Sequence, residues 1–223
     1  ISHLENHDIV RVNNTSDRDP RIAALSGGNN ARSWYARSRS RWAIGILLTS
    51  PGIPMLFMGQ EILEDKYWSD SPDHYREFLI YWDGLDHEKA MQDQLRCVRE
   101  LCWLRRRHPA LRSNGFDVHH RPDSNRVFAF HRWIEGVGRN VVVVASLNEF
   151  SLPSYQLGFP LEGHWFEAFN RDMYDNWVNP NVVGNGGSVH VTDHGFDGLP
   201  ASARITLPAN SILVFTRDEG DHI

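Results

Sequence analysis

The sequence has 223 residues, 41% of them hydrophobic and 11% aromatic, which is enough to bury a core in one large domain or two ordinary ones. Its 23 basic and 28 acidic residues give a formal net charge of −5, so a nucleic-acid partner is not expected. No apolar run reaches the roughly 18 residues that a membrane span requires, so no membrane partner is expected either.

The first predicted unit is a strand, a polar loop and a helix. Residues 1–5 predict a short strand that leads into the polar stretch HLENHDIVRVNN at residues 3–14. Residues 31–49 then predict a helix that becomes buried toward its end, and Pro51 with its neighbours Ser and Gly ends it. Carboxylate, imidazole and carboxamide groups directly after a strand indicate a site and not only a turn.

The second unit repeats this order. The continuous apolar run IPMLFMG at residues 53–59 predicts a strand that is covered on both faces. A long polar and aromatic loop follows over residues 60–88, and apolar residues then recur at helical spacing from Met91 until Pro109. Sites of parallel α/β proteins lie at the carboxyl ends of the strands, so both long loops are candidate site segments.

The pattern changes after Gly115. Short β-rich runs such as RVFAFHRWI and NVVVVASL alternate with Gly, Pro, Asn and Asp, and no helix of any length is expected. We therefore predict an α/β part at residues 1–112 and an antiparallel β-sandwich at residues 113–223. Cys97 and Cys102 lie five residues apart in the preceding helix, too far for a disulfide, which indicates a reducing and hence cytoplasmic location.

Asn6, His7 and Asp8 are the first candidate site residues. A carboxylate can accept hydrogen bonds from two adjacent sugar hydroxyls and a histidine can donate a third, as glycoside cleavage requires. The structural alternative is an Asx turn or a helix cap, which Asn and Asp often form. The residues alone leave both interpretations open.

Other candidates also carry two interpretations. Trp68 could stack on a sugar ring or pack the long loop, and Gln60 and Glu61 could face a cleft or cap a turn. We predict no cofactor and no metal site. Two groups of residues are predicted to be structural. The histidines of a sheet face are His119, His120 and His131, and the arginines of a solvated helix end are Arg105, Arg106 and Arg107.

Three motifs in order carry a family resemblance. ENHD after a strand, then PGIPMLFMGQE, then a β-rich tail ending LPANSILVFTR resemble the C-terminal half of glycoside hydrolase family 13, the α-amylase superfamily. The resemblance implies the last two βα units of a (β/α)8 TIM barrel followed by a C-terminal antiparallel β-sandwich. A barrel needs roughly 250 residues, so residues 1–110 supply about two of its eight units.

The resemblance also implies roles for single residues. Asp8 is similar to the aspartate of the family that stabilises the transition state, and His7 to its substrate-binding histidine, whereas Asn6 matches by letter only. The nucleophile and the general acid of the family precede Ile1, so the chain alone is expected to be inactive. The remaining barrel half, or a second copy of the chain, is a candidate partner.

Within the superfamily, the detail resembles 1,4-α-glucan branching enzymes, which implies an α-1,4-glucan substrate such as glycogen, starch or maltooligosaccharides. The insertion at residues 9–30 and the loop WSDSPDHYREFLIYWDGLDHEKA carry this likeness. Bacterial branching enzymes usually read Ser-His-Asp-Glu where this chain has Asn6-His7-Asp8-Ile9, which leaves an α-amylase-type hydrolase or a trehalose-releasing relative as an alternative. A third alternative is a non-catalytic glycan-binding or structural fragment.

Overall fold

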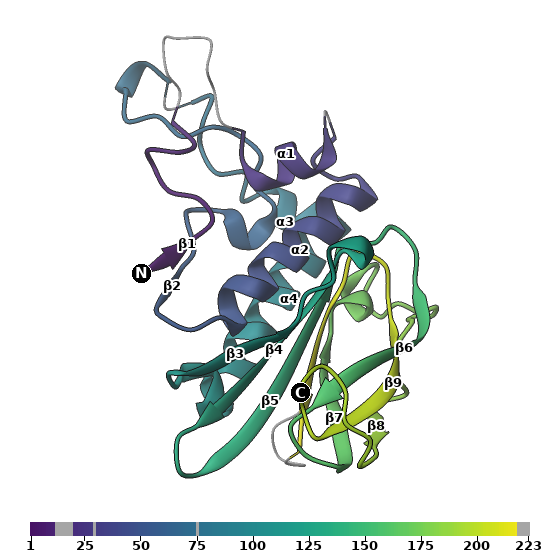
Figure 1. Cartoon of the computed structure of the whole chain (residues 1–223). Coiled ribbons are helices and arrows are strands. Elements are labelled where there is room, and N and C mark those ends of the chain that lie inside the picture. The colour runs from purple at the N-terminus through teal and green to yellow at the C-terminus, as the bar shows by residue number, and fades with distance from the viewer. Residues whose placement is uncertain (12–19, 29, 75, 218–223) are drawn as a thin grey trace.

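The computed structural model describes residues 1–217 except 12–19, 29 and 75 (Figure 1). Part of the predicted insertion at residues 9–30 therefore lies outside the described residues. The helices are α1 (Ile22–Gly27), α2 (Trp34–Thr49), α3 (Gly84–His87) and α4 (Lys89–Arg107). The strands are β1 (Ser2–His3), β2 (Pro54–Met55), β3 (Gly115–His120), β4 (Val127–Ile134), β5 (Gly138–Ser146), β6 (Leu152–Phe159), β7 (Gly163–Asn170), β8 (Ser188–Val191), β9 (Ala201–Leu207) and β10 (Ile212–Thr216).

The two long helices lie where the sequence predicted them. The Ser33 hydroxyl accepts a hydrogen bond from the Ala36 amide and caps the start of α2. Helix α4 ends just before Pro109, and its two cysteines, Cys97 and Cys102, are both free. Among the described residues, no helix is long and apolar enough to cross a membrane.

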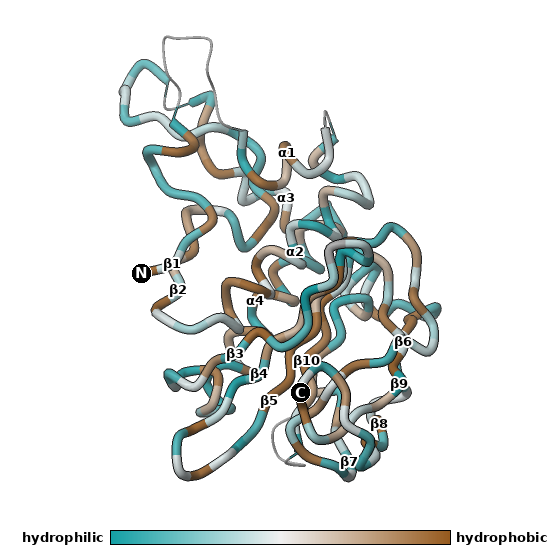
Figure 2. Tube along the Cα trace, viewed as in Figure 1, coloured by the Kyte–Doolittle hydropathy of each residue, from teal (hydrophilic) through white to brown (hydrophobic). Residues whose placement is uncertain are grey.

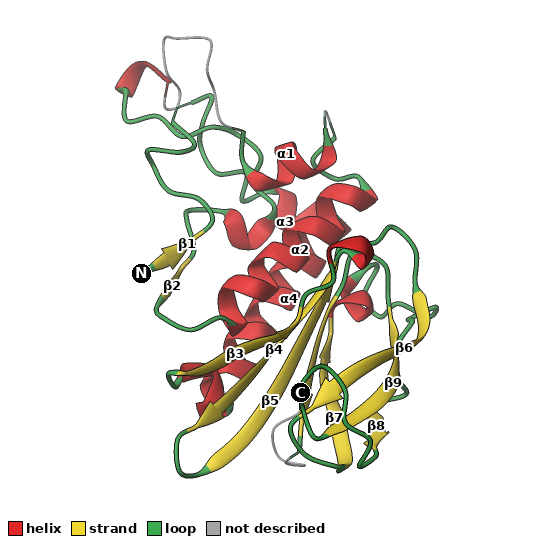
Figure 3. Cartoon of the chain, in the orientation of Figure 1, coloured by secondary structure: helices red, strands yellow, loops and turns green. Residues whose placement is uncertain are grey.

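The β half is an antiparallel domain made of two sheets. Six strands pair in the order β3-β4-β5-β10-β7-β8, and β6 pairs with β9 in a separate sheet. Figure 3 shows the helices on one side of the long strands, with β6 and β9 on the other. The expected β-rich half is confirmed, and its only helical turns among the described residues are short 3-10 segments. The division of the chain into domains at residues 112 and 113 stays a prediction.

The six-stranded sheet carries a separate apolar core on each face. Val141 and Val143 of β5 pack with the helix residues Ile44, Leu48 and Leu101. The alternate residues of the same strand turn to the opposite face and pack against the β6-β9 sheet. The brown, apolar colour of β5 and β10 in Figure 2 follows from this burial on both faces.

Strands β1 and β2 pair in parallel, but they are much shorter than predicted. Ser2 pairs with Pro54 and His3 with Met55, which makes two residues in each strand where five and seven were expected. The prediction that residues 53–59 form a strand covered on both faces is wrong, because residues 53–58 are all exposed or half-buried. The physical reason is that β1 is the only strand neighbour of β2 in the described chain.

Arg105 has a different role from the one predicted. It is buried, and it donates hydrogen bonds to the carbonyls of Leu48, Ser50 and Gly52 at 2.8, 3.0 and 2.6 Å. A guanidinium can satisfy several of the carbonyls that are left free where a helix ends. Arg105 therefore caps α2 and holds the connection to β2, and it is not part of a solvated helix end.

Substitution of Gly45 tests the contact between α2 and the sheet. A Cβ atom at this position would lie 2.6 Å from Cγ2 of the buried Ile212. Gly45→Val should therefore reduce the free energy of unfolding by about 1–3 kcal/mol, measured by urea denaturation.

The matched control is Ala43→Val, in the same helix on a half-buried position. It introduces the same branched side chain and should cost no more than about 0.7 kcal/mol in helix propensity. Equal losses in the two variants would contradict the close packing of α2 on β10.

Candidate functional site

The polar loop after β1 is built around Asn6. The side-chain oxygen Oδ1 of Asn6 accepts hydrogen bonds from the amides of Asp8 and Ile9, both at 2.9 Å, and its carbonyl accepts one from Val10 at 3.1 Å. This arrangement is an Asx turn. Asn6 therefore orients its neighbours, and its own contact with a substrate stays a prediction.

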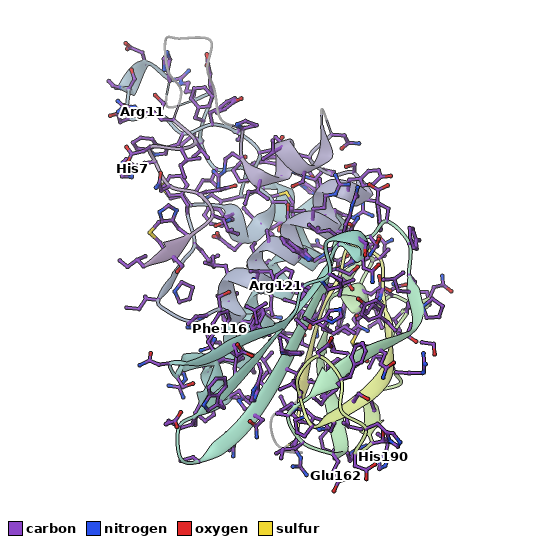
Figure 4. The ribbon with its side chains drawn as sticks, in the orientation of Figure 1. His7, Arg11, Phe116, Arg121, Glu162 and His190 are labelled. Atoms are coloured by element: carbon purple, nitrogen blue, oxygen red, sulfur yellow. The ribbon has the colours of Figure 1, made fainter. Side chains whose placement is uncertain are left out.

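His7 and Asp8 are carried outward by this turn. Their side chains are 60% and 75% exposed, and Nε2 of His7 lies 3.4 Å from Oδ1 of Asp8. Figure 4 shows His7 at the outer edge of the loop. Both groups are therefore accessible to a ligand, and the carboxylate can accept hydrogen bonds from two hydroxyls.

Trp68, 61 positions further along the chain, lies beside His7. The two rings meet edge to face with their centroids 5.7 Å apart, and Phe57 supports the indole from another side at 6.5 Å. The Trp68 amide donates to the Val10 carbonyl at 3.0 Å. The structure therefore brings together the predicted residues of both loops.

Sequence reasoning missed the ion pair that fastens this contact. Both terminal carboxylate oxygens of Asp70 lie 2.8 Å from Nη2 of Arg11, and the Arg11 guanidinium also lies 6.0 Å from the centre of the Trp68 ring. The side chains of the pair are 44% and 55% exposed. A pair at such exposure stabilises by about 0–1 kcal/mol, so it orients the loops more than it holds them.

A buried ion pair beneath the loop was missed as well. Glu5 and Arg21 are each 2% exposed, and their charged groups are 2.8 Å apart. The second oxygen of Glu5 accepts a hydrogen bond at 2.7 Å from the amide of Ile22, where α1 begins. Burial raises the pKa of the Glu5 carboxyl, and the charge of Arg21 opposes that shift.

Arg21 also connects the two strand ends. It donates to the Met58 carbonyl at 2.8 Å, and its guanidinium lies 5.5 Å from the centre of the Phe57 ring. Gln60 is buried, and its side-chain oxygen accepts from the Phe57 amide at 3.3 Å. Gln60 is therefore a turn residue, while the neighbouring Glu61 is half-buried.

The exposed part of the site offers a carboxylate, an imidazole and an indole. Such groups can hydrogen-bond to sugar hydroxyls and cover an apolar sugar face. Within the described residues, no group of three or more His, Cys, Asp and Glu side chains could hold a metal ion.

The β half is similar to a known domain family. Residues 118–218 match the family model described as the alpha amylase, C-terminal all-beta domain. Among solved structures, a variant of AmyP in complex with maltotriose superposes with a TM-score of 0.65 at 16% identity, covering 96% of this chain and 40% of that one. A pullulanase from Bacillus acidopullulyticus gives a TM-score of 0.59 at 18% identity, covering 88% and 22%. At such identities these structures support the fold alone.

The chain is also similar over most of its length to proteins named 1,4-alpha-glucan branching enzyme GlgB. The relative from Myxococcus xanthus is 33% identical over 200 residues, which cover 86% of this chain and 26% of the relative. The relative from Mycobacterium tuberculosis is 32% identical over 203 residues, covering 86% and 25%. The predicted resemblance to the C-terminal portion of the α-amylase superfamily, and to branching enzymes within it, is confirmed. The chain spans about a quarter of the length of these relatives.

The buried ion pair can be tested by hydrogen exchange. Glu5→Gln leaves the Arg21 guanidinium buried without its counter-ion, at a cost of about 3 kcal/mol. We expect the amide of Ile22, which donates to Glu5, to exchange about a hundredfold faster in this variant.

The exposed pair provides the control. Asp70→Asn removes the same charge from the Arg11 contact and should change the exchange of the Ile22 amide by no more than a few-fold. If the Glu5 variant exchanged no faster than the Asp70 variant, the loop would be held by other contacts.

Proposed function

We propose that this chain is the C-terminal part of a 1,4-α-glucan branching enzyme that transfers glucan chains by a retaining mechanism. On this proposal, residues 1–112 form the last two βα units of a (β/α)8 barrel, and the antiparallel domain follows them. The names and the coverage of the relatives support it. So does the parallel pairing of β1 with β2, each followed by a long loop and a helix.

The contact of His7 with Trp68 is the observation that carries the proposal. Asp8 and His7 follow β1, and Trp68 follows β2, so residues from two parallel strands meet beyond the carboxyl ends of both. Active sites of (β/α)8 barrels are built from loops at that end. Asp8 would accept hydrogen bonds from two sugar hydroxyls, His7 would donate one, and Trp68 would cover a ring face.

On this proposal, the catalytic groups of the retaining mechanism come partly from this chain and partly from the rest of the barrel. In the retaining mechanism, one carboxylate attacks the sugar and another acts first as acid and then as base. We assign both to strands that precede Ile1, and we assign to Asp8 the stabilisation of the oxocarbenium-like transition state. Branching requires a sugar hydroxyl, in place of water, to intercept the glycosyl-enzyme. The chain alone is therefore proposed to be inactive on starch.

An α-amylase-type hydrolase is the second candidate, because the chain has Asn6 where branching enzymes usually have Ser. In this structure Asn6 forms the Asx turn that presents His7 and Asp8. A serine hydroxyl can accept the same hydrogen bonds, so the exchange affects the turn and not the sugar contacts. The exchange at Asn6 therefore gives the hydrolase little support, and only Ile9 in place of Glu still favours it.

The role of Asp8 is tested in the complete protein with amylose as substrate. Branching weakens iodine staining while few new reducing ends appear, whereas hydrolysis releases reducing ends in proportion. Asp8→Asn keeps the hydrogen-bonding shape but loses the charge, so the rate should fall by about 10²–10³-fold with the fold intact.

Asp86→Asn, an exposed carboxylate on α3, is the control and should keep the parent rate. A loss below about tenfold in the Asp8 variant, worth only ~1.4 kcal/mol, would make Asp8 a turn residue. Release of reducing ends in step with the loss of staining would favour the hydrolase.

The exposed apolar residues at the β1-β2 pair lead to a proposal about partners. Ile1, Ile53 and Met58 are 87%, 69% and 50% exposed. We propose that the rest of the barrel covers them, and that the isolated chain buries them by self-association. Light scattering should then give a mass above that of one chain, and replacing Ile53 and Met58 by serine should restore the monomer. A strictly monomeric parent chain would contradict the proposal.

A further inference from the structure

A cavity of about 470 Å³ lies in the β half, apart from the site described above. It opens between the end of β3, strand β6 and the loop that follows β8. Arg121, one of its lining residues, is well separated from His7 and Arg11 in Figure 4. Its lining residues include His119, His120, Asn125, Tyr155, Phe196 and Asp197.

A β-bulge places two consecutive histidines in this cavity. Val118 pairs with Phe130 and His120 pairs with Ala129, so His119 is an extra residue in β3. In a regular strand, neighbouring side chains point to opposite faces, and a bulge re-aims one of them. Both histidines belong to the sheet, as predicted, but the bulge brings the two of them to the same cavity.

One wall of the cavity is held by a chain of side-chain contacts. Nε2 of His120 lies 2.6 Å from the Tyr155 hydroxyl, and its Nδ1 lies 2.8 Å from the carboxylate of Asp197. The other oxygen of Asp197 accepts a hydrogen bond at 3.0 Å from the Gly158 amide. These contacts join β3, β6 and the loop, so the wall is formed before any ligand arrives.

The loop that carries Asp197 is itself a tight hairpin turn. Asp197 and Gly198 have φ angles of 56° and 76°, and the amides and carbonyls of Phe196 and Leu199 pair across them. A Cβ atom at position 158 would lie 2.4 Å from the Phe196 carbonyl oxygen. The glycine therefore lets the turn dock closely on β6 and sets the position of the Phe196 ring.

His119 has unused hydrogen-bonding capacity in the cavity. Both of its ring nitrogens are buried and have no hydrogen-bond partner among the described residues. Burial lowers the pKa of His119 to about 4, so at neutral pH the ring is uncharged and offers one donor and one acceptor. A hydroxyl both donates and accepts, so it suits either nitrogen once the ring, whose nitrogens are now covered, turns toward the cavity.

The charges of the lining favour a neutral ligand. The carboxylate of Asp197 balances the single guanidinium of Arg121 and already contacts His120. The aromatic rings of Tyr155 and Phe196 offer apolar faces beside these polar groups. Aromatic faces combined with neutral donors and acceptors suit a polyhydroxylated ring better than a phosphate.

We propose that this cavity is a second carbohydrate-binding site, which takes one or two glucose units of an α-glucan chain. The choice of α-glucan among neutral sugars rests on the function proposed above. Such a site would hold a glucan chain on the β half, away from the bond that reacts.

The site is tested by nuclear magnetic resonance of the histidine rings in the full 223-residue chain, titrated with maltotriose. The signals of His119 and His120 should shift saturably. His119→Ala should weaken binding by at least about fivefold, read from the His120 signal, because one hydrogen bond is lost. His190→Ala, an exposed histidine of β8 at the far end of the sheet in Figure 4, should leave the affinity unchanged.

Gln156→Ala, a second change in the lining, keeps the test valid if His119→Ala does not fold. The proposal would be overturned by unmoved His119 and His120 signals, or by parent affinity in both His119→Ala and Gln156→Ala. Shifts caused by inorganic phosphate but not by maltotriose would also overturn it.

The amylose assay on the complete protein separates this inference from the proposed function. If amylose is remodelled while the His119 and His120 signals stay still, only the second site is wrong. If those signals shift although amylose is not remodelled, the sugar site stands without the branching activity.

Discussion

The burial of β5 and β10 on both faces is the constraint on which the rest of the structure depends. Val141 and Val143 face the helices, while the alternate residues Val142 and Val144 face the β6-β9 sheet. A strand covered on both sides cannot alternate apolar and polar residues, which is why the sequence has four valines in a row. Helices α2 and α4 therefore share a core with the β half, whatever covers their other sides.

The site is connected to this body through three arginines, of which only the outermost is exposed. Arg105, buried, caps α2 and holds the chain that leads to β2. Arg21, also buried, joins Glu5 to the end of the second strand. Arg11, half exposed, fixes only the outermost contact. We therefore expect the exposed Arg11 contact to open more easily than the two buried ones, as suits a binding loop that has to adjust.

The sequence predicted what depends on local pattern. The bounds of α2 and α4 followed from periodicity and from Pro51 and Pro109, and the β-rich half followed from its turn residues. Trp68 was predicted to contact sugars because aromatic residues in a site loop can stack on sugar rings, and the structure places it beside His7.

Contacts that depend on partners distant in the sequence could not be predicted. In the sequence, Glu5 is one polar residue among several. Its burial could not be predicted because it requires Arg21, sixteen positions away. The pairing of His120 with Asp197 depends on a bulge in β3, which leaves no mark on the sequence.

We expect helices α2 and α4 and the two β-sheets to form one cooperative unit. Native-state hydrogen exchange of the 223-residue chain across a urea series tests it most directly. The buried amides of Leu101 in α4 and of Val143 in β5 should converge on a single opening free energy with the same urea dependence. A helix amide that opens with a clearly lower free energy and a smaller urea dependence than the strand amide would show two independent units and contradict the account.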